Sequence, residues 1–160
     1  MSTVPLRKFV EHAAERASRV FNRAGEFLPM YHYIDRDGKD FVVPAPPTQD
    51  KDAAVAIVRA VLEACGATRV AFLDEAWMLD AQRSGFDFEQ ANRDGISKHP
   101  DRIEVLLISA EDQNEGLVMA SREIIRHDNR VVLGKLKFMP DGGELQGRMV
   151  GLLPAPERKH

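Results

Sequence analysis

The chain has 160 residues, of which 44% are hydrophobic, and its formal net charge is −3. This length and apolar share are sufficient for one domain with its own core, and the slightly acidic balance is not typical of proteins that bind nucleic acids or anionic membranes. We therefore expect a single domain over residues 1–153. Residues 154–160 show no apolar periodicity and are expected to form a flexible tail.

Cysteine content and hydropathy bear on the compartment. Cys65 is the only cysteine, so no internal disulfide can form, which fits a reducing environment. No window approaches the roughly 18 uninterrupted apolar residues of a membrane-spanning helix, and the first residues lack the apolar run of a signal peptide. We expect a cytoplasmic protein that does not enter a membrane.

Apolar residues recur at helical spacing in two segments. The first runs from Leu6 to the residue before Gly25, and a glycine at this position readily ends a helix. The second begins at Thr48 or Asp50, either of which can cap a helix, and ends before Gly66. Its predicted buried stripe consists of Ala54, Ile57, Val58, Val61 and Leu62. We expect both helices to lie on one face of a sheet.

Runs rich in β-branched and aromatic residues predict the strands of that sheet. They are Met30–Ile34, Asp40–Val43, Val70–Leu79, Glu104–Ala110, Leu117–Arg126, Val131–Met139 and Gln146–Leu153. Short connections such as Asp35–Asp40 and Asp112–Gly116 favour antiparallel hairpins. The order helix, hairpin, helix, strand meander predicts an α+β fold: a mainly antiparallel sheet of about six to seven strands with two amphipathic helices packed on it.

Two adjacent carboxylates interrupt the apolar strand Val70–Leu79. Neighbouring side chains of a strand point to opposite faces, so Asp74 and Glu75 are expected on opposite faces, with Trp77 on the face of Glu75. A carboxylate on an apolar face must find a partner, change its pKa or reach solvent. Such a departure from the local pattern marks a candidate functional site.

The roles of these residues depend on their neighbours. If the strand carrying Arg122 and Glu123 lies beside them, Arg122 could pair with one carboxylate and leave the other with a shifted pKa, as a general acid or base requires. The alternative, which we favour, is a structural ion pair with the remaining acids facing solvent. Trp77 is either a core aromatic residue, the reading we favour, or a binding platform beside Glu75.

A long polar connection, Asp80–Arg102, follows the same strand and is predicted to contribute to a recognition surface. The predicted binding residues are Asp74, Glu75, Trp77, Phe86, Phe88, Arg122 and Glu123. A basic cluster between Arg122 and Lys137 has few interleaved aromatic residues, so nucleic acid is not an expected partner.

Common cofactor and catalytic motifs are missing from the sequence. It contains no phosphate-binding loop, dinucleotide fingerprint, paired-cysteine zinc site or nucleophile elbow, so we expect no cofactor and no metal site. The interpretation we favour is a small binding or accessory domain for an unknown protein or small molecule, able to self-associate as a homodimer through an open sheet edge or an apolar helix face. The alternative is a small hydrolase or other acid/base enzyme that uses Asp74 or Glu75 with His99 or Arg122.

Overall fold

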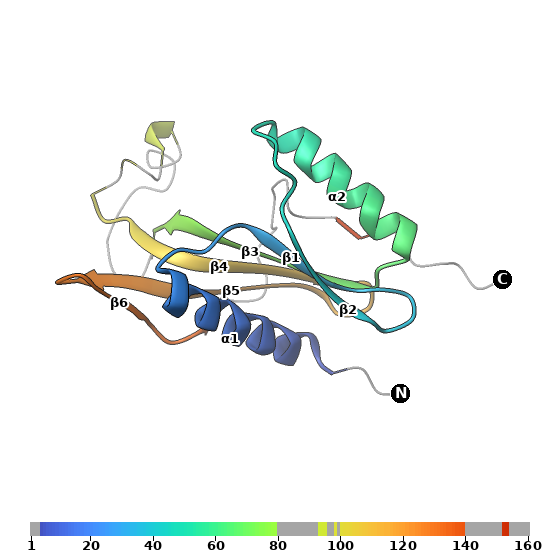
Figure 1. Ribbon diagram of the computed structural model, residues 1–160, viewed down its shortest axis with the longest axis horizontal. Coiled ribbons are helices and arrows are strands. Elements are labelled where there is room, and N and C mark those ends of the chain that lie inside the picture. Colours follow the sequence, from blue (N-terminus) through green and yellow to red (C-terminus); the bar gives the residue numbers. More distant parts are fainter. Residues whose placement is uncertain (1–3, 80–92, 96–97, 99, 140–151, 154–160) are drawn as a thin grey trace.

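In the part of the chain that the structure describes, seven antiparallel strands form one sheet with a helix on each of its faces (Figure 1). The computed structural model describes residues 4–79, 93–95, 98, 100–139 and 152–153. The helices are α1 (Leu6–Ala24) and α2 (Lys51–Cys65). The strands are β1 (Met30–Ile34), β2 (Asp40–Pro44), β3 (Arg69–Met78), β4 (Ile103–Asp112), β5 (Gly116–His127), β6 (Arg130–Leu133) and β7 (Lys137–Phe138). The predicted α+β fold is confirmed.

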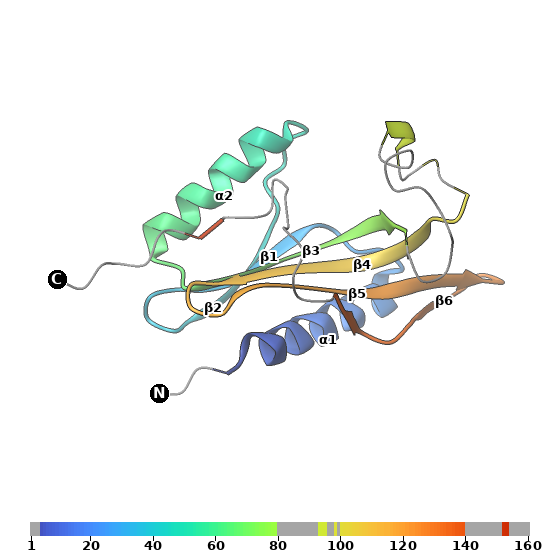
Figure 2. The same ribbon diagram turned by 180° about the vertical axis from the view of Figure 1, so that it is seen from behind.

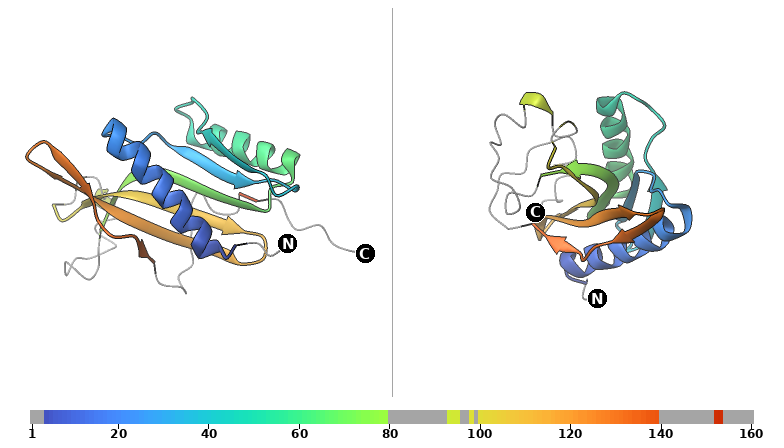
Figure 3. Two further views of the ribbon diagram at one scale, coloured as in Figure 1. Left: turned by 60° about the horizontal axis from the view of Figure 1, so that its bottom comes forward. Right: turned by 90° about the vertical axis from the view of Figure 1, so that its left-hand side faces the viewer.

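The strand order is β2-β1-β3-β4-β5-β6, and β7 also pairs with β5. The outermost strands of the main path, β2 and β6, therefore lie at opposite edges of the sheet (Figure 3). Strand β3 pairs with β4, and β4 pairs with β5, both antiparallel, so these three strands are consecutive in the chain and adjacent in the sheet. Neither helix is long and apolar enough to cross a membrane, as far as the described residues extend.

The helix boundaries follow from local chemistry. The Asp50 carboxylate accepts hydrogen bonds from the backbone N–H groups of Asp52 and Ala53, which begins α2. Helix α1 ends at Gly25, whose positive φ of 74° lets its N–H reach the carbonyl of Phe21. Gly66, at φ 62°, ends α2 in the same way. These predicted helix ends are confirmed.

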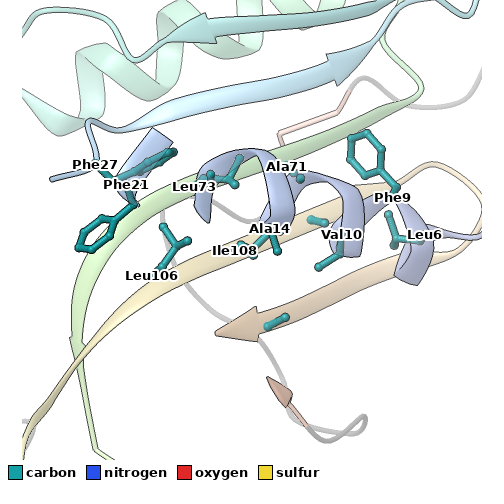
Figure 4. Close-up of a cluster of buried hydrophobic side chains, with 14 of the residues drawn as sticks. Leu6, Phe9, Val10, Ala14, Phe21, Phe27, Ala71, Leu73, Leu106 and Ile108 are labelled. Carbon is teal, nitrogen blue, oxygen red and sulfur yellow. The ribbon is translucent and has the colours of Figure 1, made fainter. Parts of the chain in front are cut away.

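The two helices cover opposite faces of the sheet (Figures 1 and 2). One core joins α1 to Ala71, Leu73, Leu106 and Ile108, and we call this side the α1 face (Figure 4). A second core joins α2 to residues of the other face, the α2 face, among them Tyr31, Tyr33 and Val70. The prediction that both helices share one face is wrong. Strand β3 is apolar on both of its faces, so each face requires its own cover.

The predicted strand Val131–Met139 is interrupted. Strand β6 pairs with the end of β5, whereas β7 pairs with β5 nearer its middle. Between them Gly134 donates its N–H to the carbonyl of Glu123 at 2.8 Å and accepts a hydrogen bond from the Arg122 side chain, so the chain leaves the regular ladder there. Most of the predicted strand Gln146–Leu153, like the predicted tail, lies outside the described residues, and Leu152 and Leu153 are not in a strand.

Candidate functional site

The two carboxylates of β3 lie on opposite faces, as their spacing predicts. Asp74 is opposite Leu107 of β4 and Glu75 is opposite Leu106. The Glu75 side chain accepts the backbone N–H of Phe27 at 2.7 Å, within the core of the α1 face. This bond holds the segment that follows α1 against the sheet. The two carboxyl groups therefore do not share one face of the sheet.

Asp74 is half-buried on the α2 face. Burial raises the pKa of its carboxyl group, the hydrogen bond from the N–H of Glu75 at 2.8 Å lowers it, the charge of Glu75 raises it and that of Lys51 lowers it, with a net upward direction. The folded protein therefore holds the Asp74 proton more tightly than the unfolded chain does. The stability that this gives is complete below the ordinary value of 3.8 and is lost as the pH rises through the raised pKa.

The substitution Asp74→Asn tests this assignment. The asparagine oxygen can keep the hydrogen bond from Glu75, but it carries no charge. We expect the free energy of unfolding of the variant to exceed that of the wild type at pH 7, and the difference to shrink as the pH falls toward 4. Urea denaturation across this pH range measures it. A variant less stable than the wild type at pH 7 would show that the buried carboxylate is stabilising.

Arg122 does not meet either carboxylate, because β4 lies between β3 and β5. Its guanidinium donates to the carbonyl of Gly134 at 2.7 Å and to the hydroxyl of Ser18 at 2.6 Å. Ser18 in turn donates to the carbonyl of Ala14 one turn earlier in α1. The hypothesis of an Arg122–carboxylate pair is wrong, and Arg122 instead ties α1 to the chain beyond β6. Glu123, the next residue of β5, is opposite Val105 of β4.

Trp77 is 46% exposed, so its interpretation as a core residue is wrong. The guanidinium of Arg102 lies over its ring, 4.8 Å from the centroid. A role as a binding platform stays a prediction. Three other predicted site residues, Phe86, Phe88 and His99, lie outside the described residues.

The predicted basic cluster is partly neutralised. Both side-chain oxygens of Glu104 accept hydrogen bonds from Arg126 at 2.9 Å. The guanidinium of Arg122 donates its hydrogen bonds to Ser18 and Gly134. Two of the cations predicted to form this cluster are therefore already engaged within the protein. In the portion of the chain described, no group of three or more His, Cys, Asp or Glu side chains is placed to hold a metal ion.

An apolar groove between α2 and the β1–β2 hairpin was not predicted. It contains a cavity of about 210 Å³. Its lining residues are Tyr31, Tyr33, Val43, Pro44, Pro46, Ile57, Val58, Val61 and Leu62. Ile57 and Val61 were assigned to the buried stripe of the second helix, but they are 48% and 44% exposed. The sheet covers only part of this stripe, and the helical pattern in the sequence does not indicate how much of it is covered.

The groove presents almost no polar chemistry. The only polar side-chain atoms among its lining residues are the hydroxyls of Tyr31 and Tyr33. Burial, aided by nearby acidic groups, raises the pKa of both phenols, so they stay neutral at physiological pH. Pro44 and Pro46 have no backbone N–H, and the N–H groups along the lining part of α2 are used inside the helix.

Comparison with known proteins identifies no relative of the chain. No protein-family model, curated protein or solved structure matches the chain. Over the residues that the structure describes, the chain is an α+β domain with two helices on a sheet and an apolar groove beside an edge strand.

Proposed function

We propose that the protein is a non-catalytic binding domain whose groove takes an uncharged, hydrocarbon-rich small molecule. The observation that carries this proposal is the 210 Å³ apolar cavity, with Ile57 and Val61 left half exposed beside it. Exposed apolar side chains gathered around a hollow are typical of ligand sites. A ligand seated there would remove these side chains from water, at about 25 cal/mol for each Å² of apolar surface buried.

The size of the cavity limits the ligand. An engineered apolar cavity of about 150 Å³ in another protein takes benzene. A cavity of about 210 Å³ therefore has room for a substituted ring or a short branched chain, and a larger ring system can extend over the open side. An ionised group would lose its hydration against these walls without gaining a partner, so a charged ligand is disfavoured.

The same walls argue against an extended peptide inside the groove. A peptide carries an N–H and a carbonyl at nearly every residue, and each needs a partner when it is buried. The proline residues and α2 offer few backbone donors in return, as described above. A hydrocarbon ligand has no such requirement.

Three hydrogen bonds weigh against the alternative of an acid/base enzyme. Glu75 and Arg122, two of its predicted catalytic residues, are engaged by Phe27, Ser18 and Gly134 within the α1 face. Asp74 lies on the α2 face, as the groove does, but it is not among the lining residues that the structure describes. The three groups therefore do not converge on the groove, and its lining residues, as far as the structure describes them, carry no carboxylate, histidine or other ionised side chain.

The test is a fluorescence titration with N-phenylnaphthylamine, which is uncharged, and with its sulfonated analogue anilinonaphthalene sulfonate. We expect saturable binding of the uncharged probe and at least about tenfold weaker binding of the sulfonate, because the two share one ring system and the analogue adds an ionised sulfonate group. We further expect Val61→Lys to weaken binding of the uncharged probe by about tenfold or more.

A matched control is available on the other helix. Val20 of α1 is 44% exposed, as is Val61, but it does not line the groove. Val20→Lys should leave probe binding within about twofold of the wild type. Equal losses in both variants, or no loss in Val61→Lys, would contradict the proposed site. Circular dichroism of each variant checks that it is folded.

A further inference from the structure

Strand β1 carries side chains to both faces of the sheet. Tyr31 and Tyr33 line the groove on the α2 face. His32, between them in the sequence, lies on the α1 face, opposite Ala71 of β3. His32 is 4% exposed, and its ring centroid lies 4.7 Å from that of Phe9 in α1. One strand therefore joins a buried histidine on one face to the groove on the other.

Charged side chains from α1, β2 and β3 face this histidine. The Asp40 carboxylate of β2 lies 3.2 Å from its Nε2 atom, but the Asp40 side chain is 55% exposed. Arg16 of α1 lines, together with His32, a hollow of about 20 Å³, which has room for about one water molecule. Arg69 of β3 lies on the same face, 5.3 Å from the centroid of the Phe9 ring, and two carboxylates pair with it. An imidazolium here would gain one partly exposed carboxylate and lose nearly all of its water.

These surroundings favour the neutral imidazole. Burial lowers the pKa of His32, the hydrogen bond and the charge of Asp40 raise it, and the charge of Arg16 lowers it, with a net downward direction. The folded protein therefore binds the His32 proton less tightly than the unfolded chain does. The stability that His32 gives is complete above the ordinary value of 6.5 and is lost as the pH falls from there through the lowered pKa.

The β1–β2 hairpin is the part of the sheet that can expose His32. Among the strands described, β2 pairs only with β1, and four of its five residues are exposed. Edge elements with few buried residues open at a lower free energy than central strands do. When the hairpin separates from α1, water reaches His32, which then binds a proton with its ordinary affinity. Each pKa unit between the closed and opened states makes the opened state about tenfold more populated in acid.

We infer that the contact between α1 and the β1–β2 hairpin is a pH-sensitive switch, which is closed around a neutral His32 and opens more often in acid. The same opening takes Tyr31 and Tyr33 away from the groove. The switch goes beyond the proposed ligand site, because it rests on the contacts of His32 on the other face of the sheet. Opening is measured without a ligand, so either proposal can fail while the other holds.

The test is amide hydrogen exchange of the whole protein, followed by NMR at pH 7 and pH 5 and corrected for the intrinsic exchange rate at each pH. At pH 7 we expect lower protection of the amides in β1 and β2 than in β4 and β5, because the hairpin opens separately. Between pH 7 and pH 5 the protection of the β1 and β2 amides should fall at least about fivefold. Equal protection in all four strands at pH 7, or no fall in the hairpin, would overturn the inference.

Two glutamine variants identify the titrating group. His32→Gln has no titrating ring, and its amide can still form a hydrogen bond with Asp40. In this variant the fall in protection should shrink to less than about twofold. His12→Gln is the matched control, since His12 is exposed on α1, and it should keep the full fall. A full fall in His32→Gln, or its loss in His12→Gln, would assign the pH dependence to another group and overturn the inference.

A titration of the His32 ring by NMR does not depend on whether His32→Gln folds. The midpoint in the wild type should lie below 6.5. Asp40→Asn removes the charge that favours the proton and should lower the midpoint further, whereas Arg16→Gln should raise it. A wild-type midpoint at or above 6.5, or shifts of the same sign in the two variants, would contradict the proposed switch.

Discussion

Arg69→Met is expected to lower the free energy of unfolding by about 3 to 5 kcal/mol. Arg69 is 3% exposed, and its guanidinium donates to Asp112 and Glu115 at 2.7 Å each and to the carbonyl of Val4 at 2.6 Å. Glu115 also accepts the N–H of Leu6, the first residue of α1. The arginine thus joins the start of α1 to the β4–β5 hairpin. Its removal leaves the nearly buried carboxylate of Asp112 without its cationic partner.

Arg126→Met provides the control for this prediction. Arg126 makes a bidentate ion pair with Glu104, but its side chain is 46% exposed. The loss in the free energy of unfolding should therefore stay below about 1 kcal/mol. Urea denaturation of the two variants measures the difference. If both variants lose the same stability, burial does not make the ion pairs of Arg69 more stabilising than the exposed ion pair of Arg126.

The same cluster gives the expected pH dependence. Burial acts to raise the pKa of Asp112, but hydrogen bonds from Asn114, Arg69 and Glu115 outweigh it, and the net direction is downward. A lowered pKa in the folded state gives stability that is present above the ordinary value of 3.8 and is lost as the pH falls through the folded value. The stability difference between wild type and Arg69→Met should therefore narrow in acid.

Leu62→Ala is the second substitution with a large expected effect, a loss of about 2 to 5 kcal/mol. Leu62 is 1% exposed and belongs to the core that joins α2 to the sheet. Truncation removes its apolar contacts and leaves a void where α2 meets the sheet. Thermal or urea denaturation measures the loss.

The control here is Leu28→Ala. Leu28 is 69% exposed, so the same chemical change should alter stability by no more than about 0.5 kcal/mol. A small effect of Leu62→Ala would mean that α2 contributes little to the fold, and the groove would then lack a rigid wall.

Local features of this fold could be predicted from the sequence. Asp50, Gly25 and Gly66 mark helix ends because capping and positive φ depend on a few neighbouring residues. The opposite placement of Asp74 and Glu75 follows from the alternation of a strand.

Long-range arrangements could not be predicted in the same way. Arg69 reaches partners 43 and 46 residues away, and no local pattern indicates them. The pairing of Arg122 with a carboxylate depended on β3 and β5 being neighbours, but the order of strands places β4 between them. The helix pattern indicates an apolar stripe on α2 but not how much of it the sheet covers, so exposure of Ile57 and Val61 required the tertiary structure.

The most direct test of the proposed groove is a methyl NMR experiment on the intact protein with bound N-phenylnaphthylamine. The proposal predicts intermolecular nuclear Overhauser effects from the probe to the methyl groups of Ile57, Val58 and Val61, all of which line the groove. Val20, which is equally exposed on α1, should show none. Contacts to Val20 in place of these three residues, or no contacts to the groove at saturating probe, would contradict the assignment of the binding site.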